Sequence, residues 1–295
     1  MAQQQTQLVV LGCGYTGRFL HRLAMTRHKF VQATSRRPEQ KLAALSSTHR
    51  VAFDIEQPDS WANIPAQADL IWCFPAMPYN QVQAFAETHI EPSQRLIILG
   101  STSAYDIARD SRTYPPPWLD ESSPIDLTKP RVQGEEYLRS EFGAIVLRVA
   151  GIYGPGRNPL DWIRQGRVDP SGKYVNLVHV EDLAAICLLA LDKGKPGEAY
   201  NVSDGQPHTW KEICINAQQR WGVTAAAVNA EHSSGKRISN AKLRTEFGYA
   251  FRYPDLYEAL ALIESADGVE AQDGQNGFQQ GPKRDGTGGI PSRVR

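Results

Sequence analysis

The chain has 295 residues, and its 32 lysines and arginines are balanced by 32 aspartates and glutamates. Since a neutral chain lacks the basic surface that attracts nucleic acid or an anionic membrane, we expect neither as a partner. No apolar run is long enough to span a bilayer, and the polar segment Met1–Gln7 lacks the pattern of a signal peptide. The cysteines are scattered without a C-x-x-C pair, which favours reduced thiols over disulfides or a metal site. We therefore expect a cytoplasmic protein.

Apolar runs of strand length alternate with helix-like stretches through the first half of the chain. The expected strands are Leu8–Leu11, Phe30–Thr34, Val51–Phe53, Leu70–Phe74, Arg95–Leu99 and Ala144–Val149. The expected helices between them are Phe19–Thr26, Pro38–Leu45 and Val82–Ile90. Continuous apolar strands separated by helices predict an α/β fold, with a doubly wound parallel sheet of the Rossmann type covered on both faces.

The second half is interrupted more often by glycine and proline. It carries expected helices at Glu181–Leu191, Trp210–Trp221 and Leu256–Ile263, and a strand at Ala199–Val202. From Ser265 the composition turns polar and glycine-rich, which predicts a disordered tail over residues 265–295. We therefore divide the chain into a sheet domain over residues 1–150, a segment over 151–264 that completes the sheet and adds a small C-terminal lobe, and the tail.

The segment Gly12-Cys13-Gly14-Tyr15-Thr16-Gly17 follows the first expected strand and opens a helix. This is the context in which a G-x-G-x-x-G motif binds a dinucleotide. Gly12 allows the tight turn, Gly14 lets the backbone approach a pyrophosphate, and Gly17 lets the helix pack closely on the strand. The N–H groups at the start of the helix then face the phosphates.

Ligands of such sheets lie beyond the carboxyl ends of the strands, so residues at those ends can share one site. Applied to the first four expected strands, this rule gives a set of cofactor-binding residues. They are Gly12, Gly14, Tyr15, Thr16, Gly17, Ser35, Arg36, Asp54, Phe74 and Pro75.

The end of the second strand indicates which dinucleotide binds. NAD-binding units place an aspartate or glutamate there, on the ribose 2′-hydroxyl, whereas this chain has Thr34-Ser35-Arg36-Arg37. A guanidinium makes paired, charge-assisted hydrogen bonds to phosphate oxygens, and Ser35 adds a hydroxyl. This favours NADP, with NAD as the alternative.

Five motifs in order resemble the extended short-chain dehydrogenase/reductase superfamily, in particular its NAD-dependent epimerase/dehydratase-like proteins. After the glycine turn come Ile98–Tyr105, Leu147–Arg157, Val178–Ala184 and Tyr200–Asp204. The resemblance runs from about Leu8 to about Ile263. It implies NAD(P) chemistry on a small hydroxyl or carbonyl compound or a sugar nucleotide. It also implies that the NAD(P)-binding domain is residues 1–150 and that the small C-terminal lobe is a substrate lobe, with Arg157 resembling a substrate contact.

The resemblance fails at the residues that do the family's chemistry. That family uses a Tyr-x-x-x-Lys pair on one helix, in which the ammonium lowers the pKa of the phenol. Alignment on Glu135 puts Leu127 at the tyrosine position and Arg131 at the lysine position. Leucine cannot donate a proton, although Arg131 can still bind the cofactor. Lys129 is one conceivable replacement acid. The candidate catalytic residues are Thr102, Ser103, Tyr105 and Arg131.

These observations leave two functions open. The first is an NAD(P)-dependent oxidoreductase or epimerase with a non-standard active site. The second is a non-catalytic dinucleotide-binding regulator or assembly factor that has lost the Tyr-x-x-x-Lys pair. The expected partners are a dinucleotide and, for the enzyme, a small-molecule substrate. The sequence leaves the oligomeric state open, a homodimer included.

Overall fold

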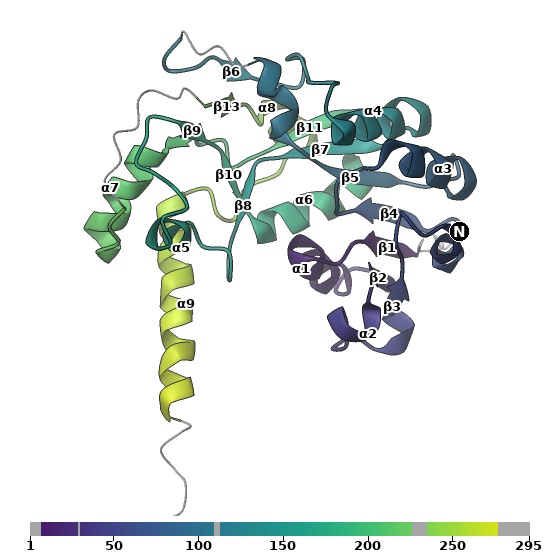
Figure 1. Cartoon of the computed structure of the whole chain (residues 1–295), viewed down its shortest axis with the longest axis horizontal. Coiled ribbons are helices and arrows are strands. Elements are labelled where there is room, and N and C mark those ends of the chain that lie inside the picture. Colours follow the sequence, from purple (N-terminus) through teal and green to yellow (C-terminus); the bar gives the residue numbers. More distant parts are fainter. Residues whose placement is uncertain (1–6, 29, 109–112, 226–234, 277–295) are drawn as a thin grey trace, which may run out of the picture.

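A seven-stranded parallel sheet lies at the centre of the molecule (Figure 1). The computed structural model describes residues 7–28, 30–108, 113–225 and 235–276. The strand order is β11-β7-β5-β4-β1-β2-β3. The strands are β1 Leu8–Leu11, β2 Val31–Ser35, β3 Arg50–Ala52, β4 Asp69–Trp72, β5 Leu96–Ser101, β7 Ile145–Val149 and β11 Ala199–Val202. Each coincides closely with an expected strand, so the predicted α/β fold is confirmed.

Helices cover both faces of the sheet because the side chains of its strands alternate between two apolar clusters. In β1, Leu8 and Val10 belong to one cluster, and Val9 and Leu11 to the other. Helices α1 (Tyr15–Ala24) and α6 (Val180–Lys193) pack on the first face, and α3 (Tyr79–His89) and α4 (Pro130–Phe142) on the second. The short α2 (Pro38–Lys41) lies beside β2 and β3.

A smaller lobe follows β7 and has its own apolar cluster. Its helices are α5 (Pro159–Arg164), α7 (Trp210–Trp221) and α9 (Leu256–Asn276). Pairs of short strands accompany them: β8 (Gly151–Tyr153) with β10 (Leu177–His179), and β9 (Tyr174–Val175) with β12 (His208–Thr209). A further pair, β6 (Trp118–Leu119) with β13 (Arg237–Ile238), lies near α8 (Ala241–Phe247).

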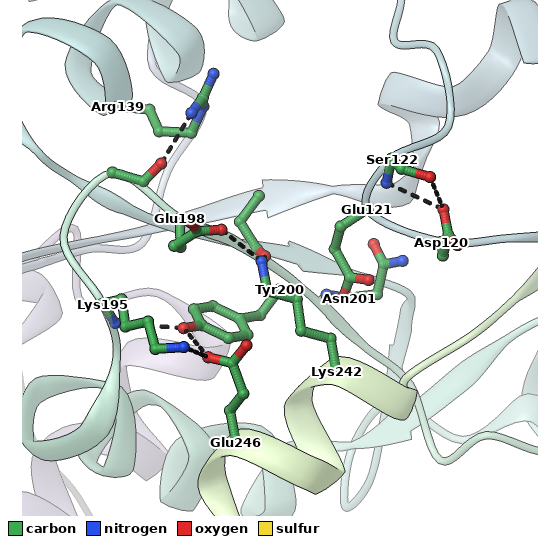
Figure 2. A network of polar contacts seen from close by, with 12 residues as sticks. Asp120, Glu121, Ser122, Arg139, Lys195, Glu198, Tyr200, Asn201, Lys242 and Glu246 are labelled. Carbon is green, nitrogen blue, oxygen red and sulfur yellow. Dashed lines mark hydrogen bonds and ion pairs between the residues drawn. The ribbon is translucent and has the colours of Figure 1, made fainter.

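Side chains cover the outer edge of β11, which has a sheet neighbour on one side (Figure 2). The Asn201 N–H donates to Glu121 Oε1 at 2.7 Å, and Lys242 Nζ donates to the Ala199 carbonyl at 2.9 Å. Both contacts satisfy backbone groups of an edge strand. Uncovered groups of this kind can pair with another chain. The network therefore protects this edge.

The last helix differs from the sequence prediction. We expected it to end at Ile263, whereas α9 continues to Asn276 and projects away from the sheet (Figure 1). Once packed turns have nucleated a helix, each further residue adds a hydrogen bond at little cost, so polar composition alone does not end it. The rest of the predicted tail, residues 277–295, lies outside the described residues. In the part of the chain that the structure describes, no helix is long and apolar enough to cross a membrane.

Candidate functional site

A cleft of about 920 Å³ opens at the carboxyl ends of β1 to β4. It brings together most of the residues expected to bind a cofactor, namely Gly12, Gly14, Tyr15, Ser35, Arg36, Asp54, Phe74 and Pro75. The other two, Thr16 and Gly17, belong to the first turn of α1 but do not line the cleft.

The glycine turn has the geometry that its motif predicts. Gly12 has φ +80°, and a Cβ added there would lie 2.6 Å from Phe74 Cδ1. A Cβ on Gly17 would lie 3.0 Å from the Gly12 carbonyl oxygen, so this position permits the close packing of α1 on the turn. A Cβ on Gly14 would meet nothing within 4 Å. The open space beside Gly14 is therefore a cradle that fits the closely approaching phosphates of a dinucleotide.

The N-terminus of α1 begins at this cradle. Gly14 is the N-cap, no side chain caps the helix, and the first turn contains no acidic residue. The first N–H groups of a helix have no intrahelical partner, and they carry the positive end of its dipole. This end of the cleft is thus suited to an anionic group.

Three cationic side chains gather at the cleft, two of which sequence reasoning missed. Arg36 was expected, and Arg18 and Lys41 join it from α1 and α2. Arg18 Nη2 donates to the Lys41 carbonyl at 3.5 Å, which ties the two helices together. None of the three forms an ion pair with a carboxylate in the described ranges. Their charge is therefore available to a ligand.

The other wall of the cleft is largely apolar. Phe53, Ile55 and Phe74 line it, and the Phe53 and Phe74 rings lie 6.3 Å apart between centroids. Asp54 Oδ1 accepts a hydrogen bond from the Glu56 N–H at 3.1 Å, so this carboxylate also orders the loop after β3. Cys13 lies in the same cleft, and burial raises the pKa of its thiol to about 11. It is therefore an uncharged thiol at neutral pH.

Tyr15 connects the glycine turn to the smaller lobe. Its hydroxyl donates to the Pro155 carbonyl at 3.1 Å, and the Arg157 guanidinium lies 5.6 Å from the centroid of its ring. Burial raises the pKa of Tyr15 to about 12, so the hydroxyl remains a donor at neutral pH. Pro155 and Gly156 line the cleft. The loop between β8 and α5 therefore closes one side of it.

The candidate catalytic residues lie outside the lining of this cleft. Thr102 and Ser103 begin the 3₁₀ helix Thr102–Ala108 directly after β5, and their hydroxyls make no hydrogen bond to other described residues. Arg131 instead faces inward: its Nε donates to Glu135 Oε1 at 2.9 Å and its Nη2 to the Leu99 carbonyl at 3.3 Å. These two bonds hold the guanidinium of Arg131 against α4 and the end of β5.

The residues considered as proton donors are held in other places. Tyr105 is fully buried; its hydroxyl donates to Asn201 Oδ1 at 2.7 Å and accepts from Arg148 Nη1 at 2.8 Å. Lys129 Nζ donates to the Ser103 carbonyl at 2.7 Å and to Asp106 Oδ2 at 2.5 Å. Leu127, at the position of the usual tyrosine, is 55% exposed. Tyr105 is therefore not brought to the cleft.

Comparisons with known proteins place this fold. No family model matches the chain. Protein YeeZ of Escherichia coli strain K12 is 30% identical over 171 residues, which cover 55% of this chain and 59% of that protein. The chain thus aligns with little more than half the length of this curated relative.

Solved structures cover more of the chain. A proposed NAD-dependent epimerase/dehydratase from Methylobacillus flagellatus superposes with a TM-score of 0.71 at 25% identity, covering 90% of this chain and all (100%) of that one. A short-chain dehydrogenase/reductase superfamily protein from Agrobacterium tumefaciens, with bound NAD, gives a TM-score of 0.75 at 14% identity and covers 92% and 99%.

The chain is therefore structurally similar to NAD-dependent epimerase/dehydratase and short-chain dehydrogenase/reductase superfamily proteins. This confirms the resemblance that its motifs indicate. It is also a distant homologue of YeeZ.

Proposed function

We propose that the chain is an NADP-binding oxidoreductase or epimerase with a non-standard active site. The observation that carries this proposal is the cleft, where an open glycine cradle meets the N-terminus of α1 and the cations of Arg18, Arg36 and Lys41. The bound NAD of the Agrobacterium tumefaciens protein supports a dinucleotide in this fold.

Different parts of the cleft are suited to different parts of the cofactor. The turn at Gly12 and Gly14 and the first N–H groups of α1 would hold the pyrophosphate. Arg36, with Ser35 beside it, would bind a 2′-phosphate, and Arg18 and Lys41 would add charge. Asp54, Phe74 and Pro75 would form the wall around the rest of the cofactor. When bound, the cofactor supplies hydride transfer.

The chain's own contribution to the reaction is substrate orientation. We assign this role to the Thr102 and Ser103 hydroxyls, because they follow β5 at its carboxyl end and are uncommitted within the described chain. Arg131 is then a positioning residue that holds Glu135 and the end of β5. Tyr105 is left out of this set because its hydroxyl is buried between Asn201 and Arg148.

One observation favours the alternative, a non-catalytic dinucleotide-binding regulator or assembly factor. None of the residues considered as the proton donor is well placed for that role. Tyr105 is buried and bound to Asn201, Lys129 is bound to Asp106, and Leu127 has no proton to donate. General acid catalysis contributes about 10²–10⁴-fold, so its loss slows a reaction without forbidding it.

The cofactor assignment is tested by Arg36→Glu. We expect this change to weaken NADPH binding about tenfold or more while leaving NADH binding nearly unchanged, because a charge-assisted hydrogen bond to the 2′-phosphate is lost. Arg37→Glu is the matched control, since Arg37 is not among the residues that line the cleft. An unchanged ratio of the two affinities in Arg36→Glu would refute the assignment.

Enzyme and regulator are separated by turnover. NADPH oxidation and NADP reduction are screened against small ketones, alcohols and nucleotide sugars. Turnover of NADPH or NADP that falls in Thr102→Ala or Ser103→Ala supports an oxidoreductase. An epimerised product, detected without net change of the cofactor, supports an epimerase. The variant Leu127→Tyr with Arg131→Lys tests whether the usual pair restores chemistry. If the native chain binds NADPH but turns over no substrate, and this variant does turn over substrate, the regulator is favoured.

A further inference from the structure

A groove of about 660 Å³ lies between α1 and the segment over residues 40–45, and we call it the α1–α2 groove. Its volume is within the range of small-molecule sites. One wall comes from α1 and its C-cap, and the other from the end of α2 and the turn that follows. The lining residues are Cys13, Arg18, His21, Arg22, Met25, Gln40, Lys41, Leu42, Ala43, Ala44 and Leu45.

The first wall is a single face of α1. Positions 18, 21, 22 and 25 are three or four residues apart, so their side chains lie on the same side of the helix. The apolar core of the sheet domain takes up Leu20 and Ala24, which lie on the opposite side. The groove is therefore bounded by a face of α1 that the core leaves open.

The inside of the groove is suited to an aliphatic chain. Cys13 and Leu42 belong to a small buried apolar cluster, against which Leu45 packs. Burial lowers the pKa of His21, so its ring is uncharged at neutral pH. None of the described residues that line the groove carries a phenyl, phenol or indole ring on which a flat ligand would stack. Flexible side chains such as that of Met25 instead adapt to an alkyl chain.

The charges that line the groove are all positive. Arg18, Arg22 and Lys41 contribute them, and no acidic residue is among the described lining residues. Arg18 and Arg22 are four residues apart on α1, a spacing at which like charges repel each other. The Arg22 side chain is 73% exposed, and its distance of 3.9 Å from Glu181 makes a loose ion pair. An anion between the two guanidinium groups would relieve their repulsion.

We propose that the α1–α2 groove binds a small aliphatic carboxylate. The carboxylate would accept charge-assisted hydrogen bonds from Arg18 and Arg22. Its alkyl chain would lie along Met25, Leu42 and Leu45, where an inorganic anion would leave the apolar surface uncovered. The site goes beyond the proposed function, because neither Arg22 nor Met25 lines the dinucleotide cleft.

The test is a calorimetric titration of the full chain, without cofactor, with hexanoate, octanoate and decanoate below their micelle concentrations. We expect saturable binding whose affinity rises about two- to fourfold for each added CH₂, because each CH₂ is partly or fully removed from water. Acetate, which has the same head without the chain, should bind far more weakly.

Two variants locate the probe in the groove. Arg22→Gln should weaken decanoate binding about three- to tenfold, because one charge-assisted hydrogen bond is lost at a partly exposed site. Arg27→Gln is its matched control, since Arg27 is exposed just after α1 and does not line the groove. Met25→Gln should weaken decanoate more than hexanoate, with Ile215→Gln, at an exposed position on α7, as its control.

The proposal is overturned if decanoate does not bind saturably, if affinity is independent of chain length, or if either Arg22→Gln or Met25→Gln leaves binding unchanged. Equal losses in the control variants also overturn it. Arg36→Gln tests for binding in the dinucleotide cleft, which Arg36 lines, whereas it does not line the groove. A loss in Arg36→Gln without a loss in Arg22→Gln assigns the probe to the cleft and overturns the proposal. Since no cofactor is present, failure of the NADP assignment leaves each of these outcomes unchanged.

Discussion

Gly134 shows how one residue shapes the cleft from outside it. A Cβ added to Gly134 would lie 2.0 Å from the Ala76 carbonyl oxygen, a distance at which backbone must move. Ala76 lies between Pro75 and Met77, which line the cleft. Because Gly134 has no side chain, α4 can pack against the backbone of Ala76 and support the wall of the cleft.

We expect Gly134→Ala to lower the free energy of unfolding by about 1–3 kcal/mol, the usual cost of overpacking, and to weaken NADPH binding. Denaturant unfolding and a cofactor titration measure the two effects. Ser140→Ala, on the exposed side of the same helix, is the control. Equal stability and affinity in Gly134→Ala and the native chain would contradict this account of the wall.

The role of a single residue can be predicted from the sequence where it depends on local backbone geometry, and cannot where it depends on tertiary packing. Gly12 and Gly17 could be assigned because their motif specifies one turn and one close approach. Arg18 and Lys41 could not, because they meet only once α2 packs near α1. Tyr105 follows the serine–threonine cluster in sequence, but its hydroxyl is held by Asn201 and Arg148 from distant strands.

The contact between α1 and the β8–α5 loop joins the sheet to the smaller lobe. Tyr15 makes this contact through its hydroxyl bond to Pro155, on a loop that borders the cleft. The contact brings two segments of the chain that are far apart in sequence to the same edge of the cleft.

We expect Tyr15→Phe to speed NADPH dissociation by about 2- to 10-fold, because one neutral hydrogen bond contributes about 0.5–1.5 kcal/mol. Stopped-flow fluorescence measures this rate. Tyr79→Phe, a change of an exposed tyrosine on α3, is the control. If dissociation is equally fast in Tyr15→Phe and the native chain, the loop does not retain the cofactor.

The strands of the sheet were predictable, whereas the end of the last helix was not. Runs such as Leu8–Leu11 are buried on both faces and therefore remain apolar at every position. The C-terminal part of α9 projects from the body of the protein, so the residue at which the helix ends is unrelated to apolar patterning. The lobe's short strand pairs were missed because pairs of two or three residues carry too little pattern.

Asp204 makes the stability of the folded protein depend on pH. It is 7% exposed, its Oδ1 accepts from the Gln206 N–H at 2.8 Å, and its Oδ2 has no partner among the described residues. Burial raises the pKa of Asp204 from 3.8 to about 7. The folded protein therefore keeps a proton that the unfolded chain releases near pH 4.

We expect this group to make the free energy of unfolding fall as pH rises from about 4 to about 7 and to have no further effect above that. Buried His21 and His179 and half-buried His208 act in the opposite direction, because desolvation lowers the pKa of each. The measurement is therefore the difference in unfolding free energy between Asp204→Asn and the native chain.

As the pH rises from about 4 to about 7, the unfolding free energy of Asp204→Asn should increase relative to that of the native chain. The increase should be on the order of a few kcal/mol, as expected for a pKa shift of this size. The same subtraction for Asp192→Asn, an exposed position on α6, is the control. A difference for Asp204→Asn that stays constant with pH would show that Asp204 is ionised in the folded protein.

We propose that the cleft at the carboxyl ends of β1 to β4 holds NADP. A fluorescence titration of the full chain with NADPH and, separately, with NADH tests it most directly. The cradle at Gly14 and the cations of Arg18, Arg36 and Lys41 predict saturable binding of NADPH, about tenfold or more tighter than that of NADH. Saturable binding of neither cofactor, or tighter binding of NADH, would contradict the claim.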